Sequence, residues 1–206
     1  MMNLQSITPP SGPLATLAEA KSYLRISDTQ DDAEIASLIQ ALSDRAESWT
    51  GRAFLTQTWA LWLDRVPGEL INASRVLALP RPPLVSVTHV KTYDPAGSAT
   101  TLNPSNYFVD AVAEPGRVVF NQEYSWPGSL RSVRAVEVQY VAGYGDATAV
   151  PAAIREGLLL WLKVLFAGRT KLLESDESSN GLVDLHKMEM PPQTLSLWKP
   201  YQLMRL

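Results

Sequence analysis

The stretch from Ile154 to Phe166 is apolar on nearly every side of a helix, and this limits the possible folds most. One stripe at helical spacing consists of Ile154, Leu158, Trp161, Leu162 and Leu165, and much of the remaining surface carries Leu159, Leu160, Val164 and Phe166. A helix of this kind must be buried on nearly every side. Because the chain has only 206 residues, we expect part of the cover to come from a neighbouring subunit. The predicted interface residues are Ile35, Leu38, Leu42, Leu159, Leu160, Val164 and Phe166.

Two further helices are predicted earlier in the chain. Thr16, followed three residues later by Glu19, has the spacing of a capping box, and a short apolar stripe follows to about residue 25. Asp31 with Glu34 repeats that spacing at the start of a longer amphipathic helix. Gly51 is a natural C-terminal stop for this second helix.

From residue 55 the apolar period changes to two, as in a strand. Further strands are predicted at residues 84–93, 107–112, 117–121 and 133–142, with turn residues between them. Their short spacing favours a small antiparallel sheet. The predicted fold class is therefore α+β, a helical bundle with a small antiparallel β-domain inserted between helices two and three.

The expected organisation follows from these elements. We predict an N-terminal arm at 1–14, the first part of the bundle at 15–53, the inserted β-domain at 54–149, the second part of the bundle at 150–169, a flexible linker at 170–190, and a C-terminal docking segment at 191–206. The arm prediction rests on its prolines, and the linker prediction rests on a polar, acidic composition.

Composition excludes several classes of function. Lys and Arg total 18 against 21 Asp and Glu, whereas a protein that grips DNA phosphates usually has a basic excess. The chain has no cysteine, which excludes disulfides and thiolate metal sites. Its longest apolar run, Gly157 to Leu162, is far shorter than the roughly 20 residues of a membrane span, so no membrane partner is expected. We also expect no signal peptide, because Met1 to Pro13 lacks a basic start followed by an apolar stretch.

The residues that could carry chemistry favour simpler interpretations, and we predict no enzyme activity, no metal and no cofactor. His89 and His186 are the only histidines, and surface side chains are the simpler interpretation of both. Catalysis or metal binding would need a second group that orients the imidazole.

Two other motifs suggest ligand sites only weakly. The acidic group Asp28, Asp31, Asp32 and Glu34 lacks the regular spacing and central Gly of a calcium loop, so helix capping is favoured. Gly143-Tyr144-Gly145 lacks the Gly-Lys-Ser/Thr of a phosphate loop, so a turn is favoured.

A series of short motifs runs in order along nearly the whole chain. The series comprises Leu24-Arg25-Ile26, Asp31-Asp32, Thr50-Gly51-Arg52, Gln57-Thr58-Trp59, Leu79-Pro80-Arg81-Pro82-Pro83-Leu84, Tyr93-Asp94, Trp126-Pro127, Ala142-Gly143-Tyr144-Gly145, Val150-Pro151, Gly168-Arg169 and Leu197-Trp198-Lys199-Pro200-Tyr201. In this order the motifs resemble the head–tail connector (adaptor) family of tailed phages and gene transfer agents.

The resemblance implies a structural role. Such a protein forms a dodecameric ring (a homo-oligomer) beneath the portal protein, between capsid and tail, and a downstream stopper or tail-completion protein follows. DNA passes through the channel during packaging and ejection without sequence-specific binding. The protein would be made in the cytoplasm of the bacterial host and would reside in the virion neck. Another neck or tail-completion protein is an alternative, and a carbohydrate-binding β module, suggested by the aromatics of the β region, is a weaker one.

The C-terminal segment leaves two interpretations open. Its apolar residues form a short motif after the predicted linker, and a tethered aromatic motif often docks in the groove of a partner. The predicted portal-binding residues are Leu195, Trp198, Pro200 and Tyr201. The other interpretation is that Trp198 folds back onto its own bundle.

Overall fold

The computed structural model describes residues 1–72, 74–175 and 189–203, and the chain divides into two compact units. The β unit consists of Met1–Ser11 and Gly51–Asp146, and the helical unit consists of Gly12–Thr50 and Ala147–Leu206. Antiparallel sheets thus interrupt the sequence of a helical unit, and the predicted α+β class is confirmed.

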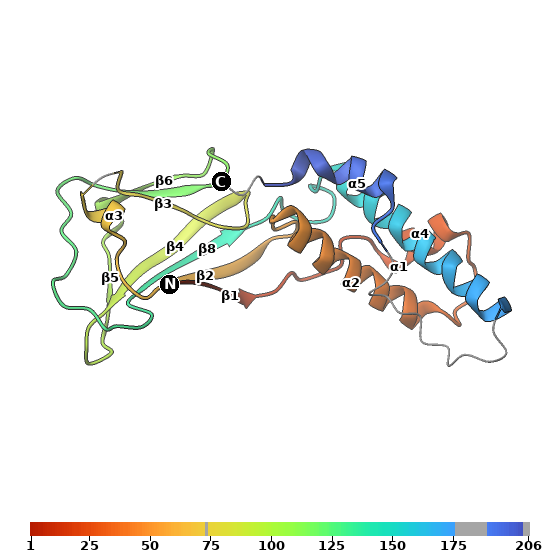
Figure 1. Ribbon diagram of the computed structural model, residues 1–206, viewed down its shortest axis with the longest axis horizontal. Helices are drawn as coiled ribbons and strands as arrows, with labels where there is room; N and C mark the ends of the chain where they lie inside the picture. Colours follow the sequence, from red (N-terminus) through yellow and green to blue (C-terminus); the bar gives the residue numbers. More distant parts are fainter. Residues whose placement is uncertain (73, 176–188, 204–206) are drawn as a thin grey trace. The chain divides into compact units, whose positions relative to one another are not determined.

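The helical unit is built from α1 (Leu17–Leu24), α2 (Asp32–Thr50), α4 (Ala152–Ser175), α5 (Pro192–Trp198) and the 3-10 turn η2 (Lys199–Tyr201). Helix α4 contacts α1, α2 and α5, and Figure 1 shows α5 running along α4. The buried residues that form the core of this unit include Leu14, Ala20, Ile35, Ile39, Leu42, Ile154, Leu158, Trp161, Leu162, Leu165 and Trp198.

The start of α1 confirms the predicted capping box. The Thr16 hydroxyl accepts a hydrogen bond from the Glu19 backbone N–H at 3.2 Å, and the Thr16 backbone N–H donates to the Glu19 carboxylate at 2.8 Å. These two bonds satisfy backbone donors that a helix start otherwise leaves unpaired. Gly51, which follows the last residue of α2, has a φ of 76°, so the predicted stop is also confirmed.

Helix α4 extends beyond its predicted end at residue 169 and reaches Ser175. The residues that follow Gly168-Arg169 include Lys171, Leu172, Leu173 and Glu174, which are strong helix formers. One glycine is therefore insufficient to end the helix. The rest of the predicted linker, up to residue 188, lies outside the described residues.

The β unit contains two antiparallel sheets where a single one was predicted. The larger sheet has the order β1-β2-β8-β4-β5, formed by Met2–Thr8, Gln57–Leu63, Val136–Ala142, Leu84–Tyr93 and Ala99–Thr101 (Figure 1). The smaller sheet has the order β3-β7-β6, formed by Val76–Ala78, Arg117–Phe120 and Tyr107–Asp110. The short elements α3 (Gly68–Asn72) and η1 (Pro104–Asn106) complete the unit.

Apolar side chains from both sheets form one core. From the larger sheet these include Leu61, Leu63, Val90, Val136, Val138 and Tyr140, and from the smaller sheet Leu77, Val118 and Phe120. Tyr140 is fully buried, and its hydroxyl donates to the Pro80 carbonyl at 2.7 Å. Burial raises the pKa of the Tyr140 phenol, which therefore stays protonated and able to donate.

The N-terminal residues differ from the predicted extended arm, because Met2–Thr8 is a strand. It pairs antiparallel with β2 in a register that places Met2 opposite Leu63 and Ser6 opposite Trp59. In this strand only Leu4 is half-buried, and every other side chain is exposed. The strand is held by backbone pairing at the sheet edge, so its side chains show no alternating pattern.

Candidate assembly surfaces

The structure divides the predicted subunit-interface residues into two groups. Ile35, Leu42 and Leu159 have exposed fractions of 0%, 3% and 8%, so they belong to the core of the helical unit. Their side chains are covered by the chain itself and form no outer surface, which corrects their assignment to a subunit interface. The reason is that α2 and α4 pack against each other, and α1 and α5 cover more of α4 than the sequence indicated.

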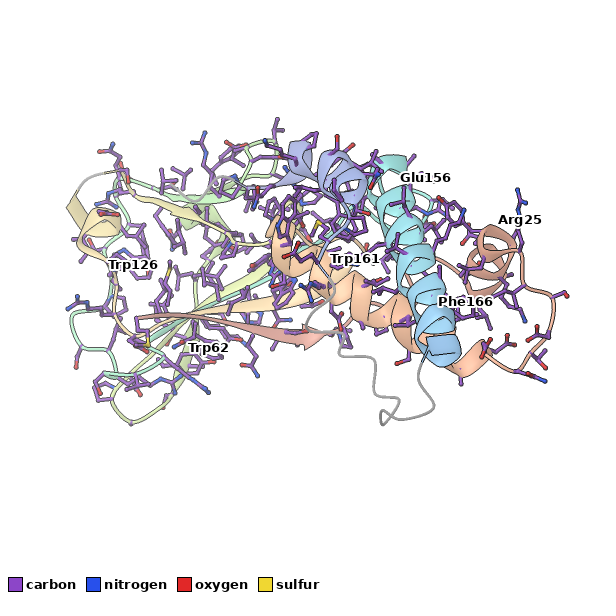
Figure 2. All side chains as sticks on the ribbon, turned by 45° about the vertical axis from the view of Figure 1, so that its right-hand side comes forward. Arg25, Trp62, Trp126, Glu156, Trp161 and Phe166 are labelled. Atoms are coloured by element: carbon purple, nitrogen blue, oxygen red, sulfur yellow. The ribbon has the colours of Figure 1, made fainter. Side chains whose placement is uncertain are left out.

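The other predicted residues remain at or near the surface. Val164 is 44% exposed, while Leu38, Leu160 and Phe166 are half-buried (Phe166 and the inward-facing Trp161 are labelled in Figure 2). Leu160 and Val164 lie four residues apart on α4, so they share one face of the helix. This pair is called the α4 stripe below.

The C-terminal helix α5 provides the cover that the sequence analysis assigned to a neighbour. Trp198 is completely buried, and its indole N–H donates to the Ile154 carbonyl at 3.0 Å. A Cβ atom added to Gly157 would lie 2.8 Å from Cδ1 and 2.9 Å from Cε2 of Trp198. Thr194 adds a hydrogen bond from its hydroxyl to the Gly157 carbonyl at 3.1 Å. Gly157 therefore forms a notch in α4 that admits the indole ring.

Trp198 is also surrounded by aromatic rings of its own unit. The ring centroids of Trp49 and Trp161 lie 6.5 Å and 5.8 Å from that of Trp198, and the Arg45 guanidinium lies over Trp161 at 5.1 Å. Of the two interpretations of Trp198, folding back onto the bundle is the one that this packing shows. Trp198 presents no surface to a partner.

The remaining predicted portal-binding residues are more accessible. Leu195 is 41% exposed, Pro200 is exposed and Tyr201 is half-buried. A hydrogen bond from the Leu203 backbone N–H to the Thr50 carbonyl, at 2.9 Å, joins the end of this segment to the end of α2. Leu195 and Pro200 thus lie on a segment that is fixed to α4 through Trp198 and to the end of α2 through Leu203.

His89 is not the solvent-facing side chain that its polar neighbours predicted. Its side chain is 17% exposed, and its Nε2 lies 3.5 Å from the carboxylate of Glu137, which is itself buried. Tyr93 donates a hydrogen bond to the same carboxylate at 2.5 Å, and the Arg131 guanidinium lies 3.9 Å from the centre of the Tyr93 ring. Burial and the bond to Glu137 raise the pKa of Tyr93 to about 12. The phenol is therefore a permanent donor at neutral pH, and the cluster acts as a polar layer on the sheet.

The acidic residues near α2 serve local structure. Asp28 accepts a hydrogen bond from the Gln30 backbone N–H at 3.2 Å, and Asp32 forms an ion pair with Lys21. Across residues 1–72, 74–175 and 189–203, no three Asp, Glu or His side chains are grouped so that they could hold a metal ion. His186 lies outside these ranges.

The glycines after β8 form a turn whose backbone donors are already used. The N–H groups of Gly143 and Tyr144 donate to the carbonyls of Pro83 and Phe54, both at 2.9 Å. Gly143 has a φ of 127°, and a Cβ atom there would lie 2.8 Å from the Thr56 nitrogen. Those two N–H groups cannot also bind a phosphate, which agrees with the turn interpretation.

The tryptophans of the β unit are engaged in packing. Trp126 lies 4.8 Å from Phe120, measured between ring centroids, and Trp62 donates from its indole N–H to Gln5 at 3.1 Å (both tryptophans are labelled in Figure 2). Trp59, on the opposite face of β2 from Trp62, packs against the β core.

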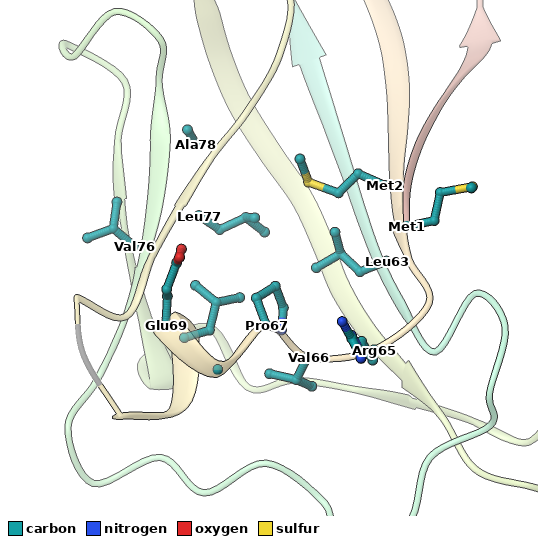
Figure 3. A pocket seen from close by; sticks show the side chains of 12 residues that line it. Met1, Met2, Leu63, Arg65, Val66, Pro67, Glu69, Val76, Leu77 and Ala78 are labelled. Atoms are coloured by element: carbon teal, nitrogen blue, oxygen red, sulfur yellow. The ribbon is translucent and has the colours of Figure 1, made fainter. Parts of the chain in front are cut away.

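A cleft of about 750 Å³ opens beside the start of β1 (Figure 3). Its lining includes Met1, Met2, Leu63, Val66, Leu77 and Ala78, which come from β1, β2, the loop after β2, and β3. Met1 and Met2 are 83% and 58% exposed. The cleft could not be predicted from the sequence, because β1 and β3 gave no strand signal.

None of the helices among the described residues is long and apolar enough to cross a membrane.

Comparison with known proteins supports the resemblance drawn from the motifs. The sequence model of the family described as phage gp6-like head-tail connector protein matches residues 14–82. The fold matches a chain in the neck of an empty gene transfer agent particle computed with C6 symmetry, with a TM-score of 0.72 and 19% identity over 99% of this chain and 97% of that one. The resemblance to head–tail connectors is confirmed.

Two further solved structures show the same fold. A chain of the native gene transfer agent virion matches with a TM-score of 0.70 and 19% identity, over 98% of this chain and 96% of that one. A chain in the neck of the native particle, computed with C12 symmetry, matches with a TM-score of 0.68 and 20% identity, over 99% and 97%. No curated protein matches the sequence. The fold shared with these particle chains therefore extends over both units, well beyond the residues that the family model matches.

Proposed function

We propose that this protein is a structural head–tail connector of the virion neck and forms a ring with further copies of itself beneath the portal. The supporting observation is the match of nearly the whole chain to neck proteins of gene transfer agent particles. Two of those necks were computed with C6 and C12 symmetry, and a closed ring is the assembly that cyclic symmetry produces. In this role the protein joins capsid to tail, and catalysis is not required.

The α4 stripe is the part of the helical unit that we assign to the ring contact. Leu160 and Val164 expose apolar surface on a helix whose opposite face is buried. Removing such surface from water stabilises association by roughly 25 cal/mol for each Å² covered. Leu38 and Phe166 are the other predicted interface residues that the fold leaves only half-buried.

Native mass spectrometry of the full-length protein, with and without portal protein, tests the ring. We expect Val164→Asp and Leu160→Asp to abolish or weaken ring formation, because each places a charge in an apolar contact. Val85→Asp is the control, because Val85 is also an exposed valine, at 53%, but lies in the β unit. Assembly of the α4 variants at the level of the control would exclude α4 as the ring contact. A wild-type protein that forms no ring even with portal protein would refute the connector function.

The portal contact that we propose is the accessible part of the C-terminal segment. It retains Leu195, Pro200 and Tyr201 from the predicted set, whereas Trp198 is reserved for the bundle core. Deleting residues 191–206 could not distinguish a loss of portal binding from a loss of stability, because the deletion also removes Trp198 from the core of the helical unit. A point substitution at the surface separates them.

A pull-down with portal protein tests this assignment. Leu195→Asp should lower portal binding while thermal unfolding of the helical unit stays unchanged. Gln193→Asp is the matched control, because Gln193 is exposed on the same helix and is already polar. Equal binding by both variants would exclude Leu195 from the contact.

DNA is expected to pass through the ring without being held. With a formal net charge of -3, the protein lacks the basic excess that binds phosphates tightly, and a channel that retained DNA would slow ejection. The downstream stopper or tail-completion protein is the other expected partner. The aromatics that suggested a carbohydrate-binding module are occupied in internal contacts of Trp62 and Trp126.

A further inference from the structure

The smaller sheet of the β unit carries apolar side chains on its outer face as well as in the core. Tyr107 and Val109 of β6 pack against the core, so Phe108 between them points to the opposite face. Phe108 is 65% exposed and lies opposite Val119 of β7, which is half-buried. When one face of an antiparallel sheet is exposed to solvent, that face normally carries polar residues. This apolar row therefore indicates a face that another molecule covers.

The cleft beside β1 is the complementary feature. It is lined on one side by Met1, Met2 and Leu63 and on the other by Leu77 of β3 (Figure 3). Its volume of about 750 Å³ is ample for an aromatic side chain. Methionine side chains are flexible and polarizable, and they adapt well to an inserted ring.

The exposed Phe108 and the cleft lie at the two edges of the smaller sheet. The strand order is β3-β7-β6, in which β6 carries Phe108 and β3 borders the cleft. Across a two-fold axis Phe108 and the cleft would meet reciprocally and assembly would end at a dimer, whereas the necks computed with C6 and C12 symmetry favour a contact that repeats in one direction. The pair of surfaces suits such a head-to-tail contact, which closes into a ring when the rotation between copies permits.

The charges around both surfaces are balanced. Beside the apolar row, Asp110 pairs with Arg117 at 2.9 Å. The rim of the cleft carries Arg65 and Glu69, and the N-terminal ammonium of Met1 pairs with Asp64 at 3.3 Å. Two surfaces that are each close to neutral can approach without net repulsion. This favours a second copy of the chain over a strongly charged partner.

We propose that Phe108 of one copy inserts into the cleft formed by β1, β3 and the loop after β2 of the next copy. The inference rests on the ring of the proposed function and assigns it a second contact, through the β unit. Val112, which is 94% exposed and follows β6, extends the inserted surface. The contact repeats in one direction around the ring.

Cysteine cross-linking tests the contact directly, because the natural chain has no cysteine. Phe108→Cys and Met2→Cys are introduced together and singly into the full-length protein, which is treated with a short bismaleimide in the presence of portal protein. Denaturing gels are read beside native mass spectra of the same samples. Both positions are exposed, so the substitutions leave the core intact.

The expected result is a ladder of covalent oligomers from the double variant and none from either single variant. Dimers from Phe108→Cys alone would show a two-fold contact and overturn the proposal. A ring in the native spectra without a ladder would overturn the cleft contact and leave the connector function standing. Monomers without any ladder would overturn both.

A second measurement separates insertion from mere proximity. Phe108→Asp should weaken self-association by about tenfold or more, the loss typical of removing an aromatic anchor from an interface. Val133→Asp is the control, because Val133 is exposed to a similar extent, 61%, in a loop of the same unit. Equal association constants for the two variants would refute insertion.

Discussion

Replacing Gly157 with alanine should destabilise the helical unit, although the same change stabilises most helices. Alanine is better than glycine in a helix interior by about 1 kcal/mol. Here the new Cβ would meet the indole of Trp198 within 2.8 Å at Cδ1, and the ring is fully buried. The indole must therefore shift.

The expected magnitude follows from what that shift disturbs. Overpacking a buried site costs about 1 to 3 kcal/mol. Weakening the buried hydrogen bond from Trp198 to the Ile154 carbonyl costs about 1 to 3 kcal/mol more if the indole N–H is left without a partner. After subtraction of the gain in helix propensity, Gly157→Ala should lower the free energy of unfolding by about 1 to 5 kcal/mol.

Urea denaturation followed by far-ultraviolet circular dichroism and tryptophan fluorescence measures this change. Gly68→Ala is the control, because a Cβ atom there would meet no atom within 4 Å. In a double-mutant cycle, Trp198→Phe should remove much of the cost of Gly157→Ala, because the smaller ring leaves room for the methyl group. If Gly157→Ala is neutral or stabilising in the protein that keeps Trp198, the proposal that Gly157 leaves room for the indole ring is refuted.

Three further outcomes are expected from a helix cap and two titratable groups. Thr16→Ala should lower stability by about 1 kcal/mol in urea. The hydrogen bonds from Thr16 hold the pKa of the Glu19 carboxyl below its usual value. The ionised Glu19 therefore stabilises the fold fully above about pH 4.5, and this contribution is lost as the pH falls through the lowered pKa. Acid titration followed by circular dichroism measures the loss. The pKa of Tyr93 is raised to about 12, so its neutral form stabilises the fold fully below about pH 10, and that contribution is lost as the pH rises through 12. Ultraviolet titration should show a tyrosine with a pKa of about 12 that is absent in Tyr93→Phe, whereas the raised pKa of Tyr140 should persist in both proteins. A normal pKa for Tyr93 would exclude the bond to Glu137.

The elements with strong local signals could be predicted from the sequence. The capping box at Thr16, the stop at Gly51 and the strand at 84–93 all occur where the pattern placed them. The strands β1, β3 and β5 could not be predicted, because β1 has almost no buried side and the others contain three residues each. Such strands are defined by backbone pairing with distant segments, which leaves little trace in side-chain periodicity.

The candidate surfaces were harder to predict than the fold. Apolar character identified α4, but it could not distinguish residues covered by the chain from residues left outside. Ile35 and Val164 have similar apolar side chains, and only the packing decides that one is fully buried while the other is 44% exposed. Phe108 carried no signal of its own, because an apolar run in a short strand reads equally well as core.

The burial of Trp198 decides how a portal protein can use the C-terminal segment. A partner that bound the Trp198 side chain would first have to withdraw it from the notch at Gly157, and emptying a buried tryptophan site costs about 3 to 5 kcal/mol. Such a partner must bind the released form more tightly by at least that amount, since a ligand shifts an equilibrium only by its difference in affinity. A partner that binds Leu195 and Pro200 meets no such cost, because both residues are already exposed. Under the proposed portal contact, Thr194 and Trp198 therefore fix α5 on α4, while Leu195, which lies beside them on the helix and is 41% exposed, is left for the neighbouring component of the neck.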